Sequence, residues 1–215
     1  MNMENFMNRP SLYEIGIKHY TDKSISHLFS VVYDSYFQHL RDSDIKMLEL
    51  GIYKGASIKM WEEYFEKAQL HAIDILDCTY LNNDRVKVEI LNQENEDELR
   101  SLPKDFDIIL DDGGHTMLQQ QLSLKVLFVD HLKPGGTYIL EDLHTSEPKY
   151  WGSHGGNKTN NTLRLMHDLK NRFLSRDNTY FINDDDFYAI LEKIESIEIV
   201  KIKDDSITSR IIKKA

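Results

Sequence analysis

The sequence predicts an α/β fold of the doubly wound type, with a mostly parallel sheet and helices on both of its faces. Short apolar runs alternate along the chain with longer segments whose apolar residues recur at the helical period. Several of the short runs end in glycine or in acidic residues, as strands do before a turn. Strands and helices that alternate at this spacing imply βαβ crossovers, and continuous apolar runs are typical of parallel strands buried on both faces.

Each element is predicted from its own pattern, in chain order. A helix is expected over residues 24–40, and a strand over 45–50 leads through Gly51 into a helix over 57–68, for which Ser57 is the expected N-cap. Further strands are expected at 70–75, 86–91, 105–112 and 136–142, with a helix at 117–132 that stops at Lys133-Pro134-Gly135-Gly136. A glycine- and asparagine-rich loop then leads to a helix at 162–174. Two apolar runs at 194–203 and 206–214 are expected to form a final antiparallel pair.

Length and composition favour one domain. A chain of 215 residues with 40% hydrophobic and 29% charged content is large enough to bury its own core. We therefore expect a single domain over 1–215, with a helical cap region at 1–44 and the core at 45–215. No apolar run approaches the roughly 18 residues that a membrane span requires, and residues 1–10 lack the charged start and apolar centre of a secretory signal. A soluble, cytoplasmic protein is the expectation.

Charge and cysteine content limit the partners and the metal ligands. The net charge of −10 argues against nucleic acid as the main partner, because phosphate binding usually leaves a basic face. The single cysteine, Cys78, has no partner for an intramolecular disulfide and cannot build a cysteine-based metal site. Any metal must therefore be held by oxygen or nitrogen ligands.

The ends of the first two strands carry candidate ligand-binding residues, since open α/β sheets bind ligands beyond the carboxyl ends of their strands. Glu49 is followed by Gly51 and Gly55, and glycines there let the backbone turn tightly towards a ligand. Asp74 ends the next strand, and its two oxygens suit the two hydroxyls of a ribose. The loop lacks the G-x-G-x-x-G spacing of a pyrophosphate site, so a ligand without phosphate fits better. A plain strand-to-helix turn and a surface aspartate are the alternatives.

Acidic residues follow two other strand ends. The pairs Asp111-Asp112 and Glu141-Asp142 should converge at one edge of the sheet, where carboxylates without a counter-charge would repel one another. Oxygen ligands of this kind suit Mg²⁺, Ca²⁺ or Mn²⁺, so a bound metal is the economical explanation. His115 lies three residues after Asp112 on a glycine-flanked turn, where an imidazole that titrates near neutrality could remove a proton from a metal-bound hydroxyl. Solvated loop carboxylates and a structural histidine are the alternatives.

These residues give the chain a resemblance to a known family. It resembles the metal-dependent sugar O-methyltransferases of macrolide biosynthesis and the related cephalosporin-hydroxylase-like methyltransferases. The resemblance runs from about Tyr13 to Trp151 and includes YEIGIKHYTDKS, MLELGIYKGASIKMWEEYF, the strand-end Asp74, IILDDGGHT and LKPGGTYILEDLHTS. The last two motifs are distinctive of this group, whereas any class I methyltransferase can show the glycine loop.

The resemblance implies a Rossmann-like class I methyltransferase with a seven-stranded sheet, which uses S-adenosylmethionine (SAM) and Mg²⁺ or Mn²⁺. Asp112, Glu141 and Asp142 would hold the metal, and His115 would be the general base. The SAM-binding residues that it implies are Thr21, Lys23, Glu49, Gly51, Gly55, Ser57, Asp74, Gln93 and Asp111, with Gln93 bordering the adenine. The candidate contacts to the substrate are His144, Tyr150 and Trp151, and packing is the alternative role for the two aromatic residues.

The resemblance also implies the kind of substrate. We expect a hydroxylated small molecule, preferably a sugar or another polyol in a natural-product or glycan pathway, because a diol can chelate the metal. Neither nucleic acid nor a membrane is expected as a partner, and a homo-oligomer is allowed without being predicted.

The sequence departs from the family pattern at three places. Tyr20 stands before the TDK motif where relatives usually have glycine, and Gly114 stands where they commonly have serine. The segment Glu147-Pro148-Lys149 separates Ser146 from the pair Tyr150-Trp151, which in relatives tends to follow directly. None of these differences removes an implied metal ligand, but the third predicts a different loop on the substrate side.

Other functions use parts of the same pattern. A metal-dependent hydrolase or lyase would need the carboxylates and His115 but no SAM, and the glycine loop and Asp74 speak against it. A non-catalytic SAM-binding domain would usually have lost the metal ligands, which are all present here. An NAD-dependent oxidoreductase is disfavoured because the phosphate-binding spacing is absent. Binding of SAM, with NAD as the control, separates these classes.

Overall fold

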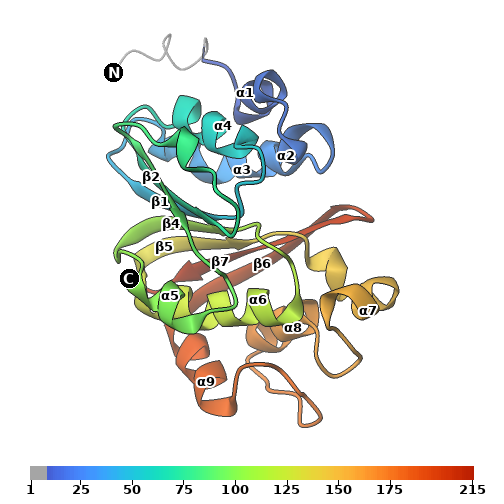
Figure 1. The fold of residues 1–215 in the computed structure, drawn as a ribbon. Coiled ribbons are helices and arrows are strands. Elements are labelled where there is room, and N and C mark those ends of the chain that lie inside the picture. Colours follow the sequence, from blue (N-terminus) through green and yellow to red (C-terminus); the bar gives the residue numbers. More distant parts are fainter. Residues whose placement is uncertain (1–8) are drawn as a thin grey trace.

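The computed structural model describes residues 9–215 and is built around one central sheet (Figure 1). The sheet has seven strands in the order β3-β2-β1-β4-β5-β7-β6. These strands are β1 (Lys46–Leu50), β2 (Gln69–Asp74), β3 (Val86–Ile90), β4 (Phe106–Asp111), β5 (Leu132–Leu140), β6 (Ile194–Lys203) and β7 (Ser206–Lys213). Strands β1 to β5 run parallel, and β7 is antiparallel to both of its neighbours. The predicted fold class and the final antiparallel pair are confirmed.

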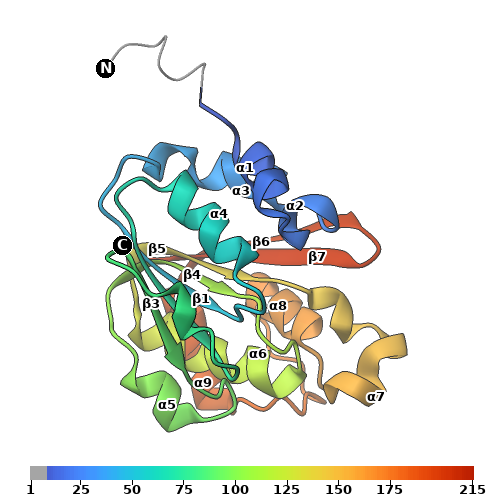
Figure 2. The ribbon, with the colours of Figure 1, turned by 45° about the horizontal axis from the view of Figure 1, so that its top comes forward.

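Helices cover both faces of the sheet, with α1, α3 and α4 on one face and α5, α6, α8 and α9 on the other (Figure 2). The α-helices are α1 (Leu12–His19), α2 (Asp22–Ile25), α3 (Phe29–Phe37), α4 (Ala56–Tyr64), α5 (Glu96–Ser101), α6 (Met117–Ser123), α7 (Trp151–His154), α8 (Thr162–Asn171) and α9 (Asp184–Lys193). Short 3-10 helices lie at Gln38–Leu40, Thr79–Leu81, Leu143–Ser146 and Pro148–Tyr150, and a π-helical turn at Leu124–Phe128 continues α6. Each face buries its own apolar core, which contains Tyr33 and Trp61 on one side and Phe128 and Phe187 on the other.

The helix predicted over 24–40 is wrong in its first part. The chain instead forms the short helix α2, a break, and then α3. Leu28 has a φ of 60° at this break, and the backbone N–H of His27 donates back to the carbonyl of Asp22 at 2.9 Å. Left-handed geometry at a leucine is strained, and the spacing of apolar residues does not indicate it. The apolar residues keep the helical period across the break, and the prediction therefore extended the helix through it.

Several element boundaries also differ from the prediction. The helices expected over 57–68 and 162–174 end earlier, at Tyr64 and Asn171. Helix α4 begins at Ala56, and Gly55 occupies the N-cap position with a φ of 77°, so Ser57 is not the N-cap. Glycine adopts this left-handed geometry without strain, which lets the helix begin before the serine. Strand β5 begins at Leu132 rather than at residue 136, because Leu132 already pairs with Phe106 before the register shifts.

The strand order reverses at β1, which has β2 on one side and β4 on the other. Leu50 at the end of β1 pairs with Asp111 of β4, and Asp111 pairs with Leu140 of β5. The residues that follow these three strands therefore lie side by side at the carboxyl edge of the sheet. This edge is where doubly wound sheets bind their ligands.

Within residues 9–215, no helix combines the length and the apolar character that crossing a bilayer would require. The prediction that residues 1–10 lack a secretory signal concerns a segment of which residues 1–8 lie outside the described part of the chain.

Candidate active site

A cavity of about 670 Å³ opens at the carboxyl edge of the sheet. Its walls come from the ends of β1, β2 and β3, from the turn after β4, and from residues 19–22 between α1 and α2. Its volume falls in the range of pockets that enclose a cofactor or another small molecule. The predicted site residues that line it are Thr21, Gly51, Ser57, Asp74, Gln93 and Asp112. The other predicted cofactor residues, which lie outside this lining, are Lys23, Glu49, Gly55 and Asp111.

The loop after β1 passes close to the acidic turn after β4. Gly51 has a φ of 87°, and a Cβ at this position would lie 2.1 Å from the backbone oxygen of Asp112. The backbone N–H of Asp112 donates to the carbonyl of Leu50 at 2.9 Å, which joins the two segments. Glycine alone combines the left-handed geometry with so close an approach. Gly51 therefore allows both segments to border one cavity.

Replacing Gly51 by alanine should cost more stability than left-handed backbone strain alone. Gly135 provides the matched control, because its φ is 75° and a Cβ there would meet no atom within 4 Å. We expect Gly135→Ala to lower the free energy of unfolding by about 1–2 kcal/mol through strain, and Gly51→Ala to lower it by roughly 1–3 kcal/mol more through the collision. Urea unfolding measures both costs, and equal costs would contradict the close approach at Gly51.

Asp74 ends β2 and holds the glycine loop in place. Its Oδ2 accepts the backbone N–H groups of Ile52 at 2.7 Å and Tyr53 at 3.0 Å, and its Oδ1 accepts that of Leu76 at 2.9 Å. Bonds from N–H groups to a charged carboxylate are stronger than those to a neutral acceptor. Asp74 thus shapes the cavity wall, and its contact with ribose hydroxyls stays a prediction.

Gln93 joins the end of β3 to the acidic turn. Its amide nitrogen donates to Asp111 Oδ1 at 2.7 Å and to Ser123 Oγ at 2.9 Å, and its oxygen accepts the backbone N–H of Gly114 at 3.2 Å. Burial raises the pKa of Asp111 to about 6, although the hydrogen bond from Gln93 acts to lower it. The carboxamide uses both of its ends to support the turn, and its place beside an adenine stays a prediction.

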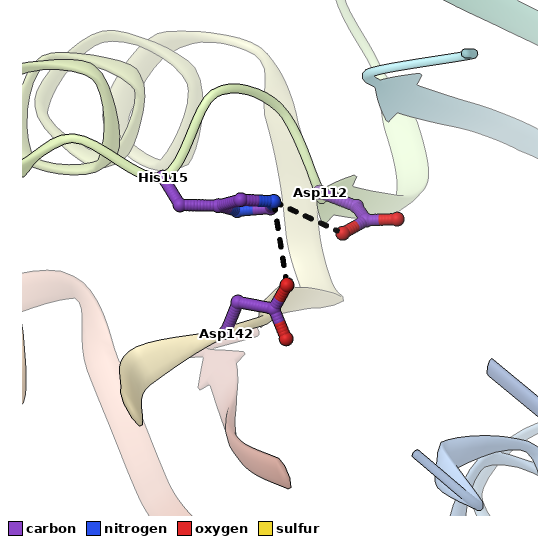
Figure 3. A group of neighbouring side chains, drawn as sticks. All are labelled: Asp112, His115 and Asp142. Atoms are coloured by element: carbon purple, nitrogen blue, oxygen red, sulfur yellow. Dashed lines mark ion pairs between the residues drawn. The ribbon is translucent and has the colours of Figure 1, made fainter. Parts of the chain in front are cut away.

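Asp112, His115 and Asp142 converge beside this turn (Figure 3). The Nε2 atom of His115 lies 3.3 Å from Asp142 Oδ2 and 3.8 Å from Asp112 Oδ1. One ligand atom of each residue lies within 4.8 Å of the others, close enough to share a cation. His115 and Asp142 have positive φ angles of 59° and 54°, a strained geometry at non-glycine residues that is common where a site fixes its side chains. The acidic ends of β4 and β5 meet, as the parallel-strand argument predicted.

Glu141, the third implied metal ligand, is bonded to a buried lysine. Lys23 Nζ donates to Glu141 Oε2 at 3.0 Å and to Asp112 Oδ2, and it lies 3.6 Å from Glu49 Oε1. Burial alone would lower the pKa of Lys23, but Asp112, Glu141 and Glu49 together raise it well above its usual value. Burial raises the pKa of Glu49 to about 7 and that of Glu141 well above its usual range, while the positive charge of Lys23 acts to lower both.

The acidic cluster, by which we mean Glu49, Asp112, His115, Glu141 and Asp142, contains buried polar atoms that its own hydrogen bonds do not satisfy. Across residues 9–215, the buried atoms without a hydrogen-bond partner include Glu141 Oε1, Asp142 Oδ1, His115 Nδ1 and both carboxylate oxygens of Glu49. Buried polar atoms usually have a partner, and carboxylate oxygens are the ligands that hard divalent cations prefer. The carboxylates therefore suit a hard divalent cation. In the described part of the chain, the residues whose ligand atoms lie close enough to share one are Asp112, His115 and Asp142, and Glu141, which is bonded to Lys23, is not one of them.

The implied substrate residues lie next to the acidic cluster. His144 Nδ1 is 3.6 Å from Asp142 Oδ1, and the His144 ring packs edge-on against Tyr150 with their centroids 5.2 Å apart. Trp151 Nε1 donates to the carbonyl of Ser146 at 2.8 Å, a contact that stabilises the local fold.

The turn between β6 and β7 contacts this side of the site. Asp205 accepts the Lys149 ammonium at 2.8 Å and the Tyr150 hydroxyl at 3.1 Å, so the segment inserted before Tyr150 is attached to the turn. Ser206 Oγ lies 2.9 Å from His27 Nδ1, within hydrogen-bonding distance. The turn therefore joins the 3-10 segment after β5 to the break between α2 and α3.

Three features of the site were not predicted from the sequence. His27 lies in the break between α2 and α3, with its ring centroid 6.3 Å from that of His144. Ile75 and Leu76 line the cavity although they are 68% and 59% exposed, and their position directly after the strand-end Asp74 was a usable signal. No pattern indicated that Lys23 bonds the carboxylates.

The strand order, the antiparallel last pair and the cavity at the point of strand reversal define the class I methyltransferase fold. Among the known structures, the MycE methyltransferase of the mycinamycin biosynthetic pathway, in complex with Mg, S-adenosylhomocysteine (SAH) and mycinamycin VI, matches this chain with a TM-score of 0.78. Its sequence identity is 25%, and the match covers 96% of this chain and 55% of that one.

Sequence comparison identifies relatives of the same kind. The chain is 31% identical over 159 residues to the mycinamicin VI 2''-O-methyltransferase of Micromonospora griseorubida, a match that covers 69% of this chain and 39% of the relative. It is 32% identical over 159 residues to the demethylmacrocin O-methyltransferase of Streptomyces fradiae, with the same 69% and 39% coverage. No protein-family profile matches the chain. The chain is related to the sugar O-methyltransferases of antibiotic biosynthesis, and it spans less than half the length of these curated relatives.

Proposed function

We propose that this protein is a SAM-dependent O-methyltransferase that uses Mg²⁺ or Mn²⁺ and methylates a hydroxyl of a sugar or polyol-like natural-product or glycan intermediate. One observation carries the proposal: Asp112 lines the cavity of about 670 Å³ and also belongs to the cluster that can hold a cation. A cofactor in the cavity and a cation on the cluster would therefore lie next to each other. The MycE complex with Mg and SAH supports this pairing.

The cavity supplies the cofactor site in this proposal. SAM would lie against the residues of its lining that the sequence implied, which are Thr21, Gly51, Ser57, Asp74 and Gln93. Glu49, Gly55, Asp111 and Lys23 would support these walls rather than form them. The segment before residue 45 then contributes to the cofactor site, since residues 19–22 are part of the lining.

The acidic cluster supplies the acceptor site. Asp112, Glu141 and Asp142 would hold the metal, which when bound lowers the pKa of an acceptor hydroxyl. His115 Nε2 faces the same carboxylates and would accept the proton of that hydroxyl. His144, Tyr150 and Trp151, the substrate contacts that the sequence implied, would bind the acceptor next to Asp142. Methyl transfer needs no covalent enzyme intermediate, so the alignment of hydroxyl and methyl group would supply much of the acceleration.

A sugar-containing acceptor is supported by the relatives, which include an L-olivosyl-oleandolide 3-O-methyltransferase of Streptomyces antibioticus. The single domain over 1–215, the cytoplasmic location, the exclusion of nucleic acid and membrane partners, and the homo-oligomer that the sequence allows all stay predictions.

Calorimetric titration of SAM into the purified protein tests the proposal. We expect saturable SAM binding in the presence of Mg²⁺ and no heat from NAD, because the loop offers no pyrophosphate site. A repeat with chelator shows whether the metal contributes to SAM binding. An absence of SAM binding with and without metal would contradict the proposal and favour a metal-dependent hydrolase or lyase. Binding without turnover on any hydroxylated acceptor would favour a non-catalytic SAM-binding domain.

A further inference from the structure

Lys23 bonds one oxygen of each of two carboxylates in the acidic cluster. Its ammonium bonds Oδ2 of Asp112 and Oε2 of Glu141. The other oxygen of Glu141, Oε1, is buried without a hydrogen-bond partner in the described part of the chain. The other oxygen of Asp112, Oδ1, lies on the side of His115, at 3.8 Å from Nε2. Each of these carboxylates thus has one oxygen committed to Lys23 and one directed elsewhere.

The lysine is held firmly in this position. Its side chain is 1% exposed, and the neighbouring Ser24 hydroxyl donates to Ser30 Oγ at 2.7 Å. Helix α1 packs directly on this segment, since a Cβ on Gly16 would lie 1.9 Å from Ser24 Oγ. Because Lys23 is almost fully buried in a segment packed against α1, its ammonium group has little room to move away from the carboxylates when a second cation binds.

We infer that Lys23 is a positioning residue that determines metal selectivity, because it limits Asp112 and Glu141 to one oxygen each as metal ligands. This inference rests on the proposed function, since it assigns the same cluster to the metal. Lys23 neutralises part of the cluster without occupying the oxygens that would bind the ion.

Mg²⁺ and Ca²⁺ differ in how they bind carboxylates, and this arrangement should therefore distinguish between them. Mg²⁺ requires a compact octahedral shell and takes single oxygens, whereas Ca²⁺ takes more ligands and often both oxygens of a carboxylate. A cluster whose second oxygens are held by an ammonium group therefore favours Mg²⁺. Without the lysine, both oxygens of Asp112 and Glu141 are available, and the site suits the larger ion better.

Metal titrations of Lys23→Met test the inference, with MgCl₂ and CaCl₂ titrated separately into chelator-treated protein. The wild type should bind Mg²⁺ more tightly than Ca²⁺. In Lys23→Met the ratio of the Ca²⁺ to the Mg²⁺ dissociation constant should fall by roughly tenfold, which is the lower end of the affinity change that the loss of a residue behind the metal ligands causes. Lys23→Arg, which keeps a cation that can bond both carboxylates, should restore most of the selectivity. Lys133→Met is the matched control, because Lys133 pairs with Asp107 at 2.9 Å, away from the cluster.

The possible outcomes separate this inference from the proposed function. A wild type that binds neither metal overturns both. A wild type that binds Mg²⁺, together with a folded Lys23→Met variant whose ratio is unchanged, overturns only the role of Lys23. If Lys23→Met does not fold, infrared difference spectra of the wild type on Mg²⁺ binding decide. A carboxylate stretching pattern of single-oxygen ligation supports the inference, and a two-oxygen pattern overturns it.

Discussion

His115→Ala should lower the methyl-transfer rate by about 10²–10⁴-fold, the usual contribution of a positioned general base. The Nε2 atom of His115 faces Asp112 and Asp142, where the acceptor hydroxyl would lie, and His115 is outside the lining of the cofactor cavity. The affinity for SAM should therefore change much less than the turnover. Single-turnover rates and SAM titrations on the same preparation measure the two effects.

The His115→Ala variant also shows whether His115 acts as a general base or as a metal ligand. His115 lies close enough to Asp112 and Asp142 to share a cation with them. If it acts only as a base, the affinity for Mg²⁺ should be nearly unchanged in His115→Ala; a strong loss would instead identify it as a ligand. His39→Ala is the control, since His39 is exposed on a 3-10 helix. Full turnover of His115→Ala with metal present would show that the base assignment is wrong.

Asp142→Asn should abolish the response of the protein to Mg²⁺. The substitution keeps the shape of the side chain but removes one of the charges that would hold the ion. We expect the affinity for Mg²⁺ to fall by more than roughly 100-fold, the upper limit for residues that only support metal ligands. Magnesium should consequently no longer raise the thermal unfolding midpoint, as it should in the wild type through preferential binding to the folded state.

The metal-free form of Asp142→Asn should be at least as stable as the metal-free wild type. Burial raises the pKa of both Asp112 and Glu141, and the charge of Asp142 raises each pKa further, as expected for neighbouring carboxylates that repel one another. Removing one of them relieves that repulsion. Asp84→Asn is the control, because Asp84 is exposed in a loop. Equal stabilisation of Asp142→Asn and the wild type by Mg²⁺ would contradict the role of Asp142 as a ligand.

The sheet was predictable because its strands are apolar runs that end at acidic or glycine residues. The expected strand over 105–112 becomes β4 at Phe106–Asp111, and the run over 194–203 becomes β6 at Ile194–Lys203. Parallel strands place their carboxyl ends along one edge, so the approach of Asp112 to Asp142 followed from the chain order alone. The general position of the site was therefore encoded in local patterns.

The parts that were not predicted depend on contacts between distant segments. Lys23 bonds residues from two strands that are far from it in the chain, and nothing near Lys23 in the sequence indicates this. The left-handed Leu28 interrupts a segment whose apolar residues follow one continuous helical period. The neighbouring His27 contacts Ser206, and a contact between such distant residues cannot be inferred from local spacing. The family resemblance placed Gln93 beside the adenine, which stays a prediction, and its bonds to Asp111 and Ser123 become visible only when three elements pack together.

The bond between His27 and Ser206 has a consequence for the order in which the protein matures. These residues are 179 positions apart, so the ribosome has synthesised most of the chain before the two can meet. Contacts of such long range close large loops late and slow the search for the native state. The side of the site next to His144 therefore closes only after the start of β7 has been synthesised. We expect this side to be among the last parts of the structure to form during synthesis.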